Sequence, residues 1–435
     1  MARKMKDSGI EWIGEIPEGW EITKIKHIVS SVTDIDHFMP DSVESGIPYL
    51  MIGNLKDLSS SIDWDSSKKI SIEDYKKLSI KSHPQKGDII FARYASIGTT
   101  CYIDTDRDFL VSYACLTIHP SDSIIGKFLS YYLKSSSFAE DVLRKTNSNT
   151  QGNVGKDSLV NATIVLPSII EQAQIVNFLD AKCSDIYAIL SKTRASIEEY
   201  KKLKQAVITQ AVTKGVRVKR EMKDSGVEWI GEIPKEFDSV QLKFFCKLIT
   251  DGTHFSPVTV ENGFPYITAG DVHGIGLDYN SAKRISEEDF QLLVAQGCQP
   301  LKGDVLLVKD GATTGRVGFV DSDTPCVILS SVAMLRPADN TDGHYLMYLL
   351  ASDFLQKQIL VSMAGSAMPR TTLTKLTKYI GLLPPFREQK EIAAYLDVKC
   401  AEIDGLIAKK EQLVKELESY KKSLIYEVVT GKREV

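Results

Sequence analysis

The sequence predicts an α+β protein: two pseudo-symmetric mixed α/β domains separated by an antiparallel coiled coil of two long helices. Two observations lead to this architecture. Met5–Pro17 (MKDSGIEWIGEIP) recurs as Met222–Pro234 (MKDSGVEWIGEIP), at an offset of 217 residues. Each copy also ends in a long amphipathic segment. A repeat of this length, present twice, indicates a duplicated domain, because solenoid units run to only about 20–50 residues.

The repeat continues through both halves of the chain. Gly46–Tyr49 (GIPY) matches Gly263–Tyr266 (GFPY) at the same offset, and Lys86–Ile89 matches Lys302–Val305 after a slip of one residue. Insertions inside the repeat are therefore small. The predicted domains are 1–167 and 218–384, with helical regions at 168–217 and 385–435.

Each body reads as a mixture of short strands and helices. Strand-like runs are bounded by Gly, Pro or Asp, which is typical of strand ends. The runs expected to be strands are 88–92, 115–118, 304–308 and 332–335, and the expected helices are 124–133 and 345–355.

Composition indicates an ordinary globular protein. Of the 435 residues, 43% are hydrophobic and 25% charged. The sequence contains no apolar run of about 18 residues and no signal-peptide pattern, so a cytoplasmic location is expected. Seven scattered cysteines without a CxxC pair favour buried, reduced thiols over a zinc site. Cys183 and Cys400 correspond across the repeat and are expected to pack within helices.

A net charge of −4 argues weakly against a freestanding nucleic-acid binder. Such proteins usually carry a basic excess that neutralises phosphates. If this chain binds DNA, its basic residues are clustered locally or a partner supplies most of the phosphate contacts.

The two long periodic segments predict amphipathic helices. Glu171–Lys214 contains no Pro or Gly, and its counterpart contains only Gly405. At about 1.5 Å per residue, each would form a rod of roughly 65 Å, too long to bury its apolar stripe in one small domain. The natural partner is the other copy, and the chain order makes the pair antiparallel. The stripe comprises Ile175, Phe178, Leu179, Ile186, Ile189, Leu190, Ile197, Tyr200, Leu203, Val207, Ile208, Ala211 and Val212, repeated as Ile392, Tyr395, Leu396, Ile403, Leu406, Ile407, Val414, Leu417, Tyr420, Leu424, Ile425, Val428 and Val429.

Both helices open with a Glu-Gln pair shortly after Leu-Pro. The pairs are Glu171-Gln172 and Glu388-Gln389. Acidic and amide side chains in a first turn complement the helix dipole and its free amides, so the main interpretation is capping. Direct docking of a partner subunit is the alternative.

The sequence contains no recognisable active site. Pro384-Pro385-Phe386 resembles an amino-methyltransferase motif, but Leu383 stands where Asp or Asn would grip the target amino group. Gly311–Arg316 lacks the lysine of a phosphate-binding loop, and no histidines are spaced as a metal pair. A chain that is not itself an enzyme, with no metal of its own, is therefore predicted.

Several motifs carry a resemblance to a known family. They are Glu11–Pro17 (EWIGEIP) with its repeat at 228–234, Leu-Pro with Glu-Gln at 166–172 and 383–389, Phe178-Leu179-Asp180 with Lys182, Tyr395-Leu396-Asp397 with Lys399, and the closing Val429–Lys432. None is decisive alone, but in their order and duplication they resemble the specificity subunit of type I restriction-modification systems over essentially the whole chain.

The resemblance implies a non-catalytic DNA reader with two target-recognition domains, each reading one half of a split sequence. It implies two modification subunits, which bind S-adenosylmethionine and methylate adenine, and restriction subunits, which use ATP and Mg. No cofactor is expected on this chain. Because the halves agree in their helices and differ through most of their bodies, an asymmetric site is predicted, with the helices setting the distance between half-sites.

Base readout uses Arg, Lys, Asn or Gln on turns that reach the groove edges. Each segment that contains a candidate also has a purely structural interpretation, as a turn that ends a strand, a polar connector or a pair of solvated basic residues. The candidates are Lys68, Lys69, Arg93, Tyr94, Ser96, Asn147, Asn149, Thr150, Gln151, Asn153, Lys283, Arg284, Lys309, Thr313, Thr314, Arg316, Ser366, Arg370, Thr371 and Thr372.

Two other functions compete with this one. A self-contained methyltransferase or nuclease with its own recognition domains would bind S-adenosylmethionine as a purified chain. A coiled-coil scaffold that binds only proteins would account for the helices, but would leave two large bodies without a role.

Overall fold

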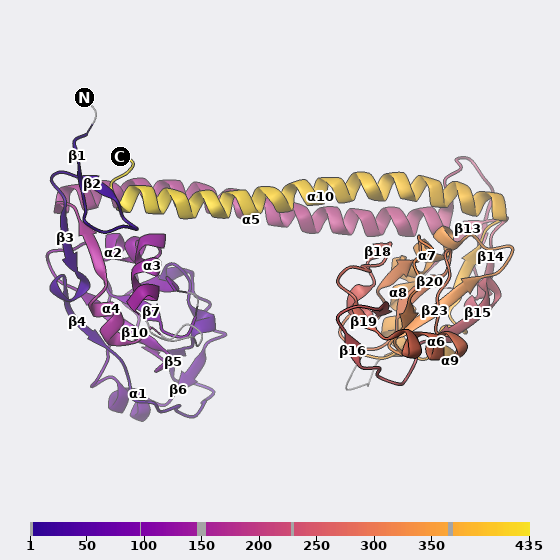
Figure 1. Ribbon diagram of the computed structural model, residues 1–435, viewed down its shortest axis with the longest axis horizontal. Coiled ribbons are helices and arrows are strands. Elements are labelled where there is room, and N and C mark those ends of the chain that lie inside the picture. The colour runs from indigo at the N-terminus through magenta and orange to yellow at the C-terminus, as the bar shows by residue number, and fades with distance from the viewer. Residues whose placement is uncertain (1–2, 96, 146–153, 228–229, 364–368) are drawn as a thin grey trace. The chain divides into compact units, whose positions relative to one another are not determined.

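The computed structural model describes residues 3–95, 97–145, 154–227, 230–363 and 369–435. The chain packs into two compact units: unit 1 is Met1–Thr193 with Gln412–Val435, and unit 2 is Arg194–Glu411. Each unit contains one mixed α/β body, the start of one long helix and the end of the other (Figure 1). The division into units crosses both helices, so the four-part domain scheme stays a prediction.

The body of unit 1 is built on a four-stranded sheet in the order β4-β10-β7-β8. A second sheet, in the order β6-β5-β9, and two strand pairs complete it. The strands of the main sheet are β4 (Val29–Thr33), β7 (Ile89–Ala92), β8 (Thr100–Tyr102) and β10 (Cys115–Pro120). The others are β1 (Met5–Asp7), β2 (Glu15–Pro17), β3 (Glu21–Lys24), β5 (Ile47–Leu50), β6 (Lys68–Ile70), β9 (Leu110–Val111) and β11 (Thr163–Leu166).

Unit 2 repeats this plan with small additions. Its main sheet has the order β15-β23-β20-β21-β18, and its second sheet the order β16-β19-β17-β22. The strands of the main sheet are β15 (Cys246–Asp251), β18 (Gly274–Ile275), β20 (Val305–Val308), β21 (Val317–Phe319) and β23 (Val332–Pro337). The others are β12 (Met222–Asp224), β13 (Glu232–Pro234), β14 (Asp238–Gln241), β16 (Thr259–Val260), β17 (Phe264–Ile267), β19 (Lys283–Ile285), β22 (Val327–Ile328) and β24 (Ile380–Leu383). The four strands predicted from the sequence are confirmed, with ends shifted by up to two residues.

The central strands are buried on both faces. In β7, Ile89 and Phe91 join the core that faces the long helices, whereas Ile90 joins a second core beneath the smaller sheet. Successive side chains of a strand point to opposite faces, so one strand serves two apolar layers. β20 shows the same alternation. Val305 and Leu307 join the core that faces the long helices, whereas Leu306 and Val308 join a second core.

Short helices cover the sheets. They are α1 (Ile72–Leu78), α2 (Gly126–Leu133), α3 (Ser136–Lys145) and α4 (Lys156–Val160) in unit 1, and α6 (Glu287–Ala295), α7 (Gly343–Ala351), α8 (Asp353–Ser362) and α9 (Leu373–Leu376) in unit 2. The helix predicted at 124–133 is confirmed as α2, and the one predicted at 345–355 is confirmed except at Ser352, which separates α7 from α8. Ser352 is extended there, with φ −67° and ψ 147°, and its hydroxyl donates to the Leu349 carbonyl oxygen at 2.6 Å, which ends α7.

The two long helices are confirmed. α5 spans Ile169–Lys214 and α10 spans Phe386–Val429. Within unit 2 they run antiparallel: Lys410 Nζ lies 5.6 Å from the Tyr200 ring centroid, and further along α5 Lys204 Nζ lies 2.6 Å from Asp404. In unit 1 the end of α10 packs on the start of α5, where Lys421 Nζ donates to the Tyr187 hydroxyl at 2.8 Å.

The apolar stripe is narrower than predicted. Within unit 1, the buried residues of α5 follow spacings of four, three and four at Leu179, Cys183, Ile186 and Leu190, the pattern of a coiled-coil seam. A helix that faces one partner helix buries this seam and leaves the flanking positions in water. The predicted stripe residues that are instead exposed are Ile189, Leu203, Tyr395, Leu406 and Tyr420.

Candidate nucleic-acid interface

The central sheet of unit 1 brings two chain segments to one end. β10 lies between β4 and β7 and is antiparallel to both, with Cys115 opposite Ala92 and Thr117 opposite Thr33. The flanking strands therefore run parallel to each other. The residues that follow them, beginning at Asp34 and Arg93, leave the sheet at the same end.

Unit 2 has the same arrangement. β23 pairs with β15 at Ala333 and Asp251, and with β20 at Val332 and Val308. The segments that follow β15 and β20 thus leave the sheet together, as in unit 1.

A third segment joins each pair through an equivalent backbone hydrogen bond. In unit 1 the Val154 amide donates to the Arg93 carbonyl oxygen at 3.0 Å, and in unit 2 the Thr371 amide donates to the Lys309 carbonyl oxygen at 2.9 Å. In unit 2, two segments selected separately from the sequence, at Lys309 and at Thr371, are therefore neighbours. We call residues 34–40, 93–94 and 154 loop cluster 1, and residues 251–258, 309–316 and 369–372 loop cluster 2.

The cation of loop cluster 1 is held by a carboxylate. Arg93 Nη1 lies 3.2 Å from Asp34 Oδ2, and the arginine side chain is largely buried. Its guanidinium carbon lies 5.7 Å from the ring centroid of Tyr94, which is exposed. The pair fixes the guanidinium beside an accessible aromatic ring.

Loop cluster 2 has a denser set of charges. Lys309 is buried, with Nζ 3.3 Å from Asp251 and 2.9 Å from Asp310. Arg370 Nε lies 2.9 Å from Asp310 Oδ1, and the arginine side chain is exposed. Lys309 therefore organises the cluster from inside, whereas Arg370 can reach a ligand.

Most threonine candidates are engaged by their own chain. Thr371 is buried, with its hydroxyl 2.6 Å from the Tyr379 hydroxyl, and Thr372 caps α9 by accepting from the Lys375 amide at 3.2 Å. Thr314 donates to the Gly311 carbonyl oxygen at 2.7 Å. Thr313 and Arg316 are half-buried in the same loop.

The four basic residues of the smaller sheets lie outside the loop clusters. Lys68 and Lys69 belong to β6, and Lys283 and Arg284 to β19. Lys68 Nζ nevertheless reaches loop cluster 1 by donating to the Pro40 carbonyl oxygen. Arg284 donates to the Gly263 carbonyl oxygen at 3.0 Å. The remaining candidates, Ser96, Asn147, Asn149, Thr150, Gln151, Asn153 and Ser366, lie outside the described residues.

Sequence reasoning missed one repeated motif in these clusters. Thr33–Pro40 (TDIDHFMP) and Thr250–Pro257 (TDGTHFSP) match at the 217-residue offset. Five of the eight positions are identical, within bodies that otherwise differ widely. The offset that revealed the duplication could also have revealed this motif.

The Glu-Gln pairs lie in each unit at the start of the long helix. Gln172 accepts from the Ile125 amide at 2.8 Å and donates to the Pro167 carbonyl oxygen at 3.0 Å. Gln389 accepts from the Asp342 amide at 2.8 Å and donates to the Pro384 carbonyl oxygen at 2.9 Å. Both are buried, so each ties the body of its unit to the helix.

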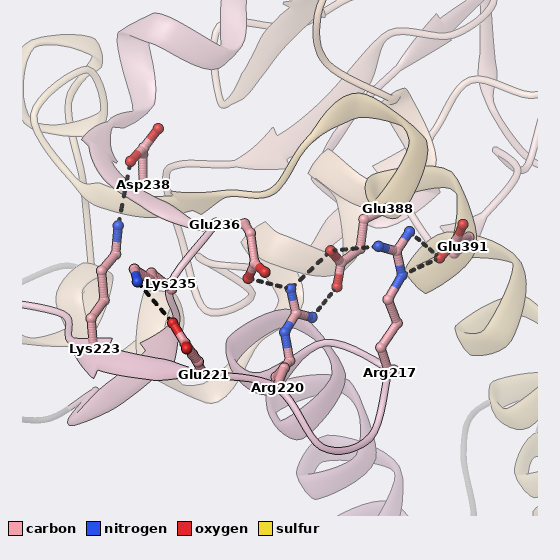
Figure 2. Close-up of polar contacts among 9 residues, drawn as sticks. All are labelled: Arg217, Arg220, Glu221, Lys223, Lys235, Glu236, Asp238, Glu388 and Glu391. Carbon is pink, nitrogen blue, oxygen red and sulfur yellow. Dashed lines mark hydrogen bonds and ion pairs between the residues drawn. The ribbon is translucent and has the colours of Figure 1, made fainter.

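The two glutamates are held by different partners. Glu171 forms a capping box, with its Oε2 2.9 Å from the Ser168 hydroxyl and 3.2 Å from the Ser168 amide. Glu388 is buried and pairs with Arg220, and Arg217 lies 3.8 Å away. Figure 2 shows both arginines pointing toward Glu388, with Arg217 also contacting Glu391 at 2.7 Å.

Two carboxylates that could suggest a nuclease have structural roles. Asp88 lies 2.9 Å from His119 Nδ1 and accepts from the Gln85 amide at 2.8 Å. Asp304, at the equivalent place in unit 2, accepts two hydrogen bonds from Arg336, at 2.8 and 2.9 Å. The Asp88–His119 pair therefore links β10 to the start of β7, and the Asp304–Arg336 pair links β23 to the start of β20.

In the parts of the chain that the structure describes, no group of three or more His, Cys, Asp or Glu side chains is arranged to hold a metal ion. No helix in those parts is long and apolar enough to cross a membrane.

One known protein-family model matches this chain twice. The family model for the type I restriction modification DNA specificity domain matches residues 17–199 and again residues 234–416. The chain belongs to this family. Its internal repeat is thus a pair of DNA specificity domains.

Curated relatives extend along nearly the whole chain. The type I restriction enzyme MjaVIII specificity subunit of Methanocaldococcus jannaschii is 24% identical over 96% of this chain and 93% of its own length. The putative MjaX specificity subunit of the same organism is 25% identical over 97% and 95%. This chain is accordingly a specificity subunit that acts in DNA target recognition and assembles with other restriction-modification subunits.

A solved structure supports the fold. One chain of a structure concerned with complex assembly and conformational transition of the type I R-M system superposes with a TM-score of 0.70 and 18% identity. The match covers 96% of this chain and 99% of that one. The specificity-subunit fold is therefore retained at low sequence identity.

Proposed function

We propose that this specificity subunit reads an asymmetric, bipartite DNA site, with loop cluster 1 reading one half-site and loop cluster 2 the other. One observation carries the proposal. The two clusters have the same backbone arrangement but different polar side chains: Arg93 and Tyr94 in one, Lys309, Asp310 and Arg370 in the other. Sequence is read by donors and acceptors set at fixed positions, so different side chains on one frame predict different half-sites.

The charge pairing of these loops supports a reading role over general phosphate attraction. Arg93 is compensated by Asp34, and Lys309 by Asp251 and Asp310. Binding to phosphates alone would favour uncompensated cations, because each neutralised phosphate releases counterions. Ion pairs instead hold a donor in one orientation before DNA arrives.

The partners and cofactors belong to the same proposal. Two modification subunits would bind S-adenosylmethionine and methylate adenine, restriction subunits would use ATP and Mg, and this chain would not be catalytic. Equilibrium dialysis of the purified chain with S-adenosylmethionine tests this division. Saturable binding to the chain alone would instead favour a self-contained methyltransferase.

Methylation mapping of host DNA, with and without the gene, tests the function directly. The expected result is a gapped motif that disappears on deletion and returns on complementation, with two halves that are not each other's reverse complement. A palindromic motif would contradict the asymmetry. A motif that survives deletion would contradict the function.

Single substitutions assign the half-sites. Tyr94→Ala should relax base preference in one half only, and Arg370→Ala in the other only. Tyr94 is preferred to Arg93, which is largely buried and paired with Asp34. Arg370 is preferred to the buried Lys309 because its exposed side chain can be removed with little effect on folding. Ile72→Ala in α1 and Leu292→Ala in α6 remove exposed apolar side chains outside the clusters and should leave both halves unchanged. A single variant that altered both halves would contradict the assignment.

A further inference from the structure

Each loop cluster exposes a His-Phe dipeptide at the same place in its repeat. The dipeptides are His37-Phe38 in unit 1 and His254-Phe255 in unit 2. The phenylalanines are 44% and 51% exposed, and both histidines are exposed as well. Exposure of an aromatic ring forgoes the free energy that its burial would provide. Finding it at both equivalent positions indicates a role in binding.

The loops that carry these dipeptides are anchored at both ends. Upstream, Asp34 pairs with Arg93 at 3.2 Å, and Asp251 pairs with Lys309 at 3.3 Å. Downstream, the proline two residues after the phenylalanine is buried in both units. The chain between these anchors is therefore held in place while its two aromatic side chains face solvent.

Local contacts orient the dipeptide itself. In unit 1 the His37 ring stacks on Tyr113, with centroids 4.3 Å apart, and Lys77 Nζ lies 5.7 Å from the Phe38 ring centroid. In unit 2 the Phe255 amide donates to the Thr253 hydroxyl at 2.9 Å. The contacts differ between the units, but both present the phenylalanine at the edge of a cation-bearing loop cluster.

We propose that Phe38 and Phe255 pack against the DNA base stack, one in each half-site, as a contact that does not depend on sequence. This inference rests on the proposed function. A phenyl ring cannot read base edges by hydrogen bonding, but its flat face can stack on any base or wedge into a base step. Two clusters that read different sequences can share contacts only to what their half-sites have in common, the phosphate backbone and the base stack, and an uncharged phenyl ring suits the stack.

The cationic surroundings favour DNA over a partner subunit as the occupant. Lys77 is exposed beside the Phe38 ring, and Arg370 is exposed in loop cluster 2. Aromatic rings next to cations are the combination with which proteins hold nucleic-acid strands. The same loops also contain the base-reading candidates, so a ring there meets the duplex when those residues do.

The test uses the full chain assembled with its modification subunits, on duplexes that contain the mapped target. 2-Aminopurine replaces one base at a time through each half-site, outside the adenine that is methylated. For the wild type, fluorescence should rise on binding at one position in each half. Phe38→Ala should abolish the rise in one half and Phe255→Ala in the other, each weakening DNA binding roughly tenfold.

Matched variants separate stacking from loss of structure. Phe38→Tyr and Phe255→Tyr keep the flat ring and should retain the fluorescence rise. Ile72→Ala and Leu292→Ala should behave as the wild type. The methylated motif should keep the same bases in every phenylalanine variant.

The outcomes distinguish the two proposals. If the wild-type complex does not bind the mapped duplex, the proposed function fails. If it binds, and the alanine variants match it in affinity and fluorescence, the stacking proposal alone is overturned. It is also overturned if those variants lose subunit assembly instead, because the rings would then contact the modification subunit.

Discussion

The starts of the two long helices carry equivalent glutamates with different supports. In unit 1, Glu171 accepts hydrogen bonds from Ser168 and from Trp20 Nε1 at 3.0 Å, and pairs with Arg3. In unit 2 the positions of Ser168 and Trp20 are occupied by Pro385 and Phe237, whose side chains cannot donate.

Unit 2 replaces the missing donors with charge. Arg220, the counterpart of Arg3, pairs with Glu388 at a site where the two side chains are 11% and 1% exposed, against 28% and 31% for Arg3 and Glu171. Arg217 adds a second cation 3.8 Å away. The two helix starts are therefore stabilised differently: unit 2 relies on a buried ion pair, whereas unit 1 combines a more exposed ion pair with hydrogen bonds from two uncharged donors.

The largest expected difference follows from that burial. Glu388→Ala should destabilise unit 2 by about 3 kcal/mol, the lower end of the range for a broken buried ion pair, because Arg220 then keeps only the exposed Glu236 as a partner. Glu171→Ala should cost unit 1 about 1–2 kcal/mol, the scale of a lost cap. Urea unfolding combined with amide hydrogen exchange at the starts of α5 and α10 measures both. Glu391→Ala is the control for removing a less buried acid, and equal losses at 171 and 388 would refute the comparison.

The neighbouring glutamines should behave alike in the two units. Gln172→Ala and Gln389→Ala each remove an acceptor from a backbone amide and a donor to carbonyl oxygens at a buried position. Each should cost about 2–3 kcal/mol, because the abandoned backbone groups remain buried. The same exchange experiment tests this. A clear inequality would show that the difference between the units extends beyond the glutamates.

Converting one helix start toward the other gives a smaller effect. Trp20→Phe installs in unit 1 the residue type that unit 2 has at Phe237, and removes the indole donor to Glu171. The expected loss in unit 1 is about 1 kcal/mol for the hydrogen bond plus a packing loss of similar size for the buried indole, with no change in unit 2. Thermal unfolding of the wild type and the variant at equal concentration measures it. An unchanged stability would mean that Ser168 and Arg3 suffice.

Lowering the pH should destabilise the start of α5 in unit 1 by less than about 1 kcal/mol, because Glu171 is partly exposed. This is the smallest of the expected effects. Burial raises the pKa of Glu171, but hydrogen bonds from Trp20 and Ser168 and the charge of Arg3 outweigh it, so the net pKa lies below the usual 4.5. A lowered pKa gives stability that is present above the unfolded value and lost as pH falls through the folded one. Wild type should therefore exceed Glu171→Gln in stability near neutral pH and converge with it in acid. A gap that persists in acid would contradict this.

Local sequence signals predicted the frame better than the interface. Glu11–Pro17, Asp180 and Asp397 made the family recognisable, and each has a structural place: Ile13 and Ile16 are buried, and the aspartates accept from Tyr131 and Tyr348 at 2.8 Å. Such residues recur in both halves because both bodies must pack on the same helices.

Within the candidate interface the sequence selected the right segments but not the state of their side chains. Lys309 and Arg370 were chosen for the same property, yet one is buried between two carboxylates and the other is exposed. Charge and turn propensity are local quantities. Burial depends on which distant segment packs alongside, here residues 369–372, and no local sequence pattern predicts that contact.

The sequence by itself determined the duplication, the two long helices and the family, because repeats and helical periodicity are properties of residues near one another in the chain. Only the tertiary structure decided which loops meet at the end of each central sheet and which stripe residues remain in water. It also decided that Glu388 is held by two arginines, whereas Glu171 is held by one arginine, a serine and a tryptophan. These outcomes depend on strand order and on helices that pack at long range. The physical reason is that burial and pairing are set by contacts between residues far apart in the chain.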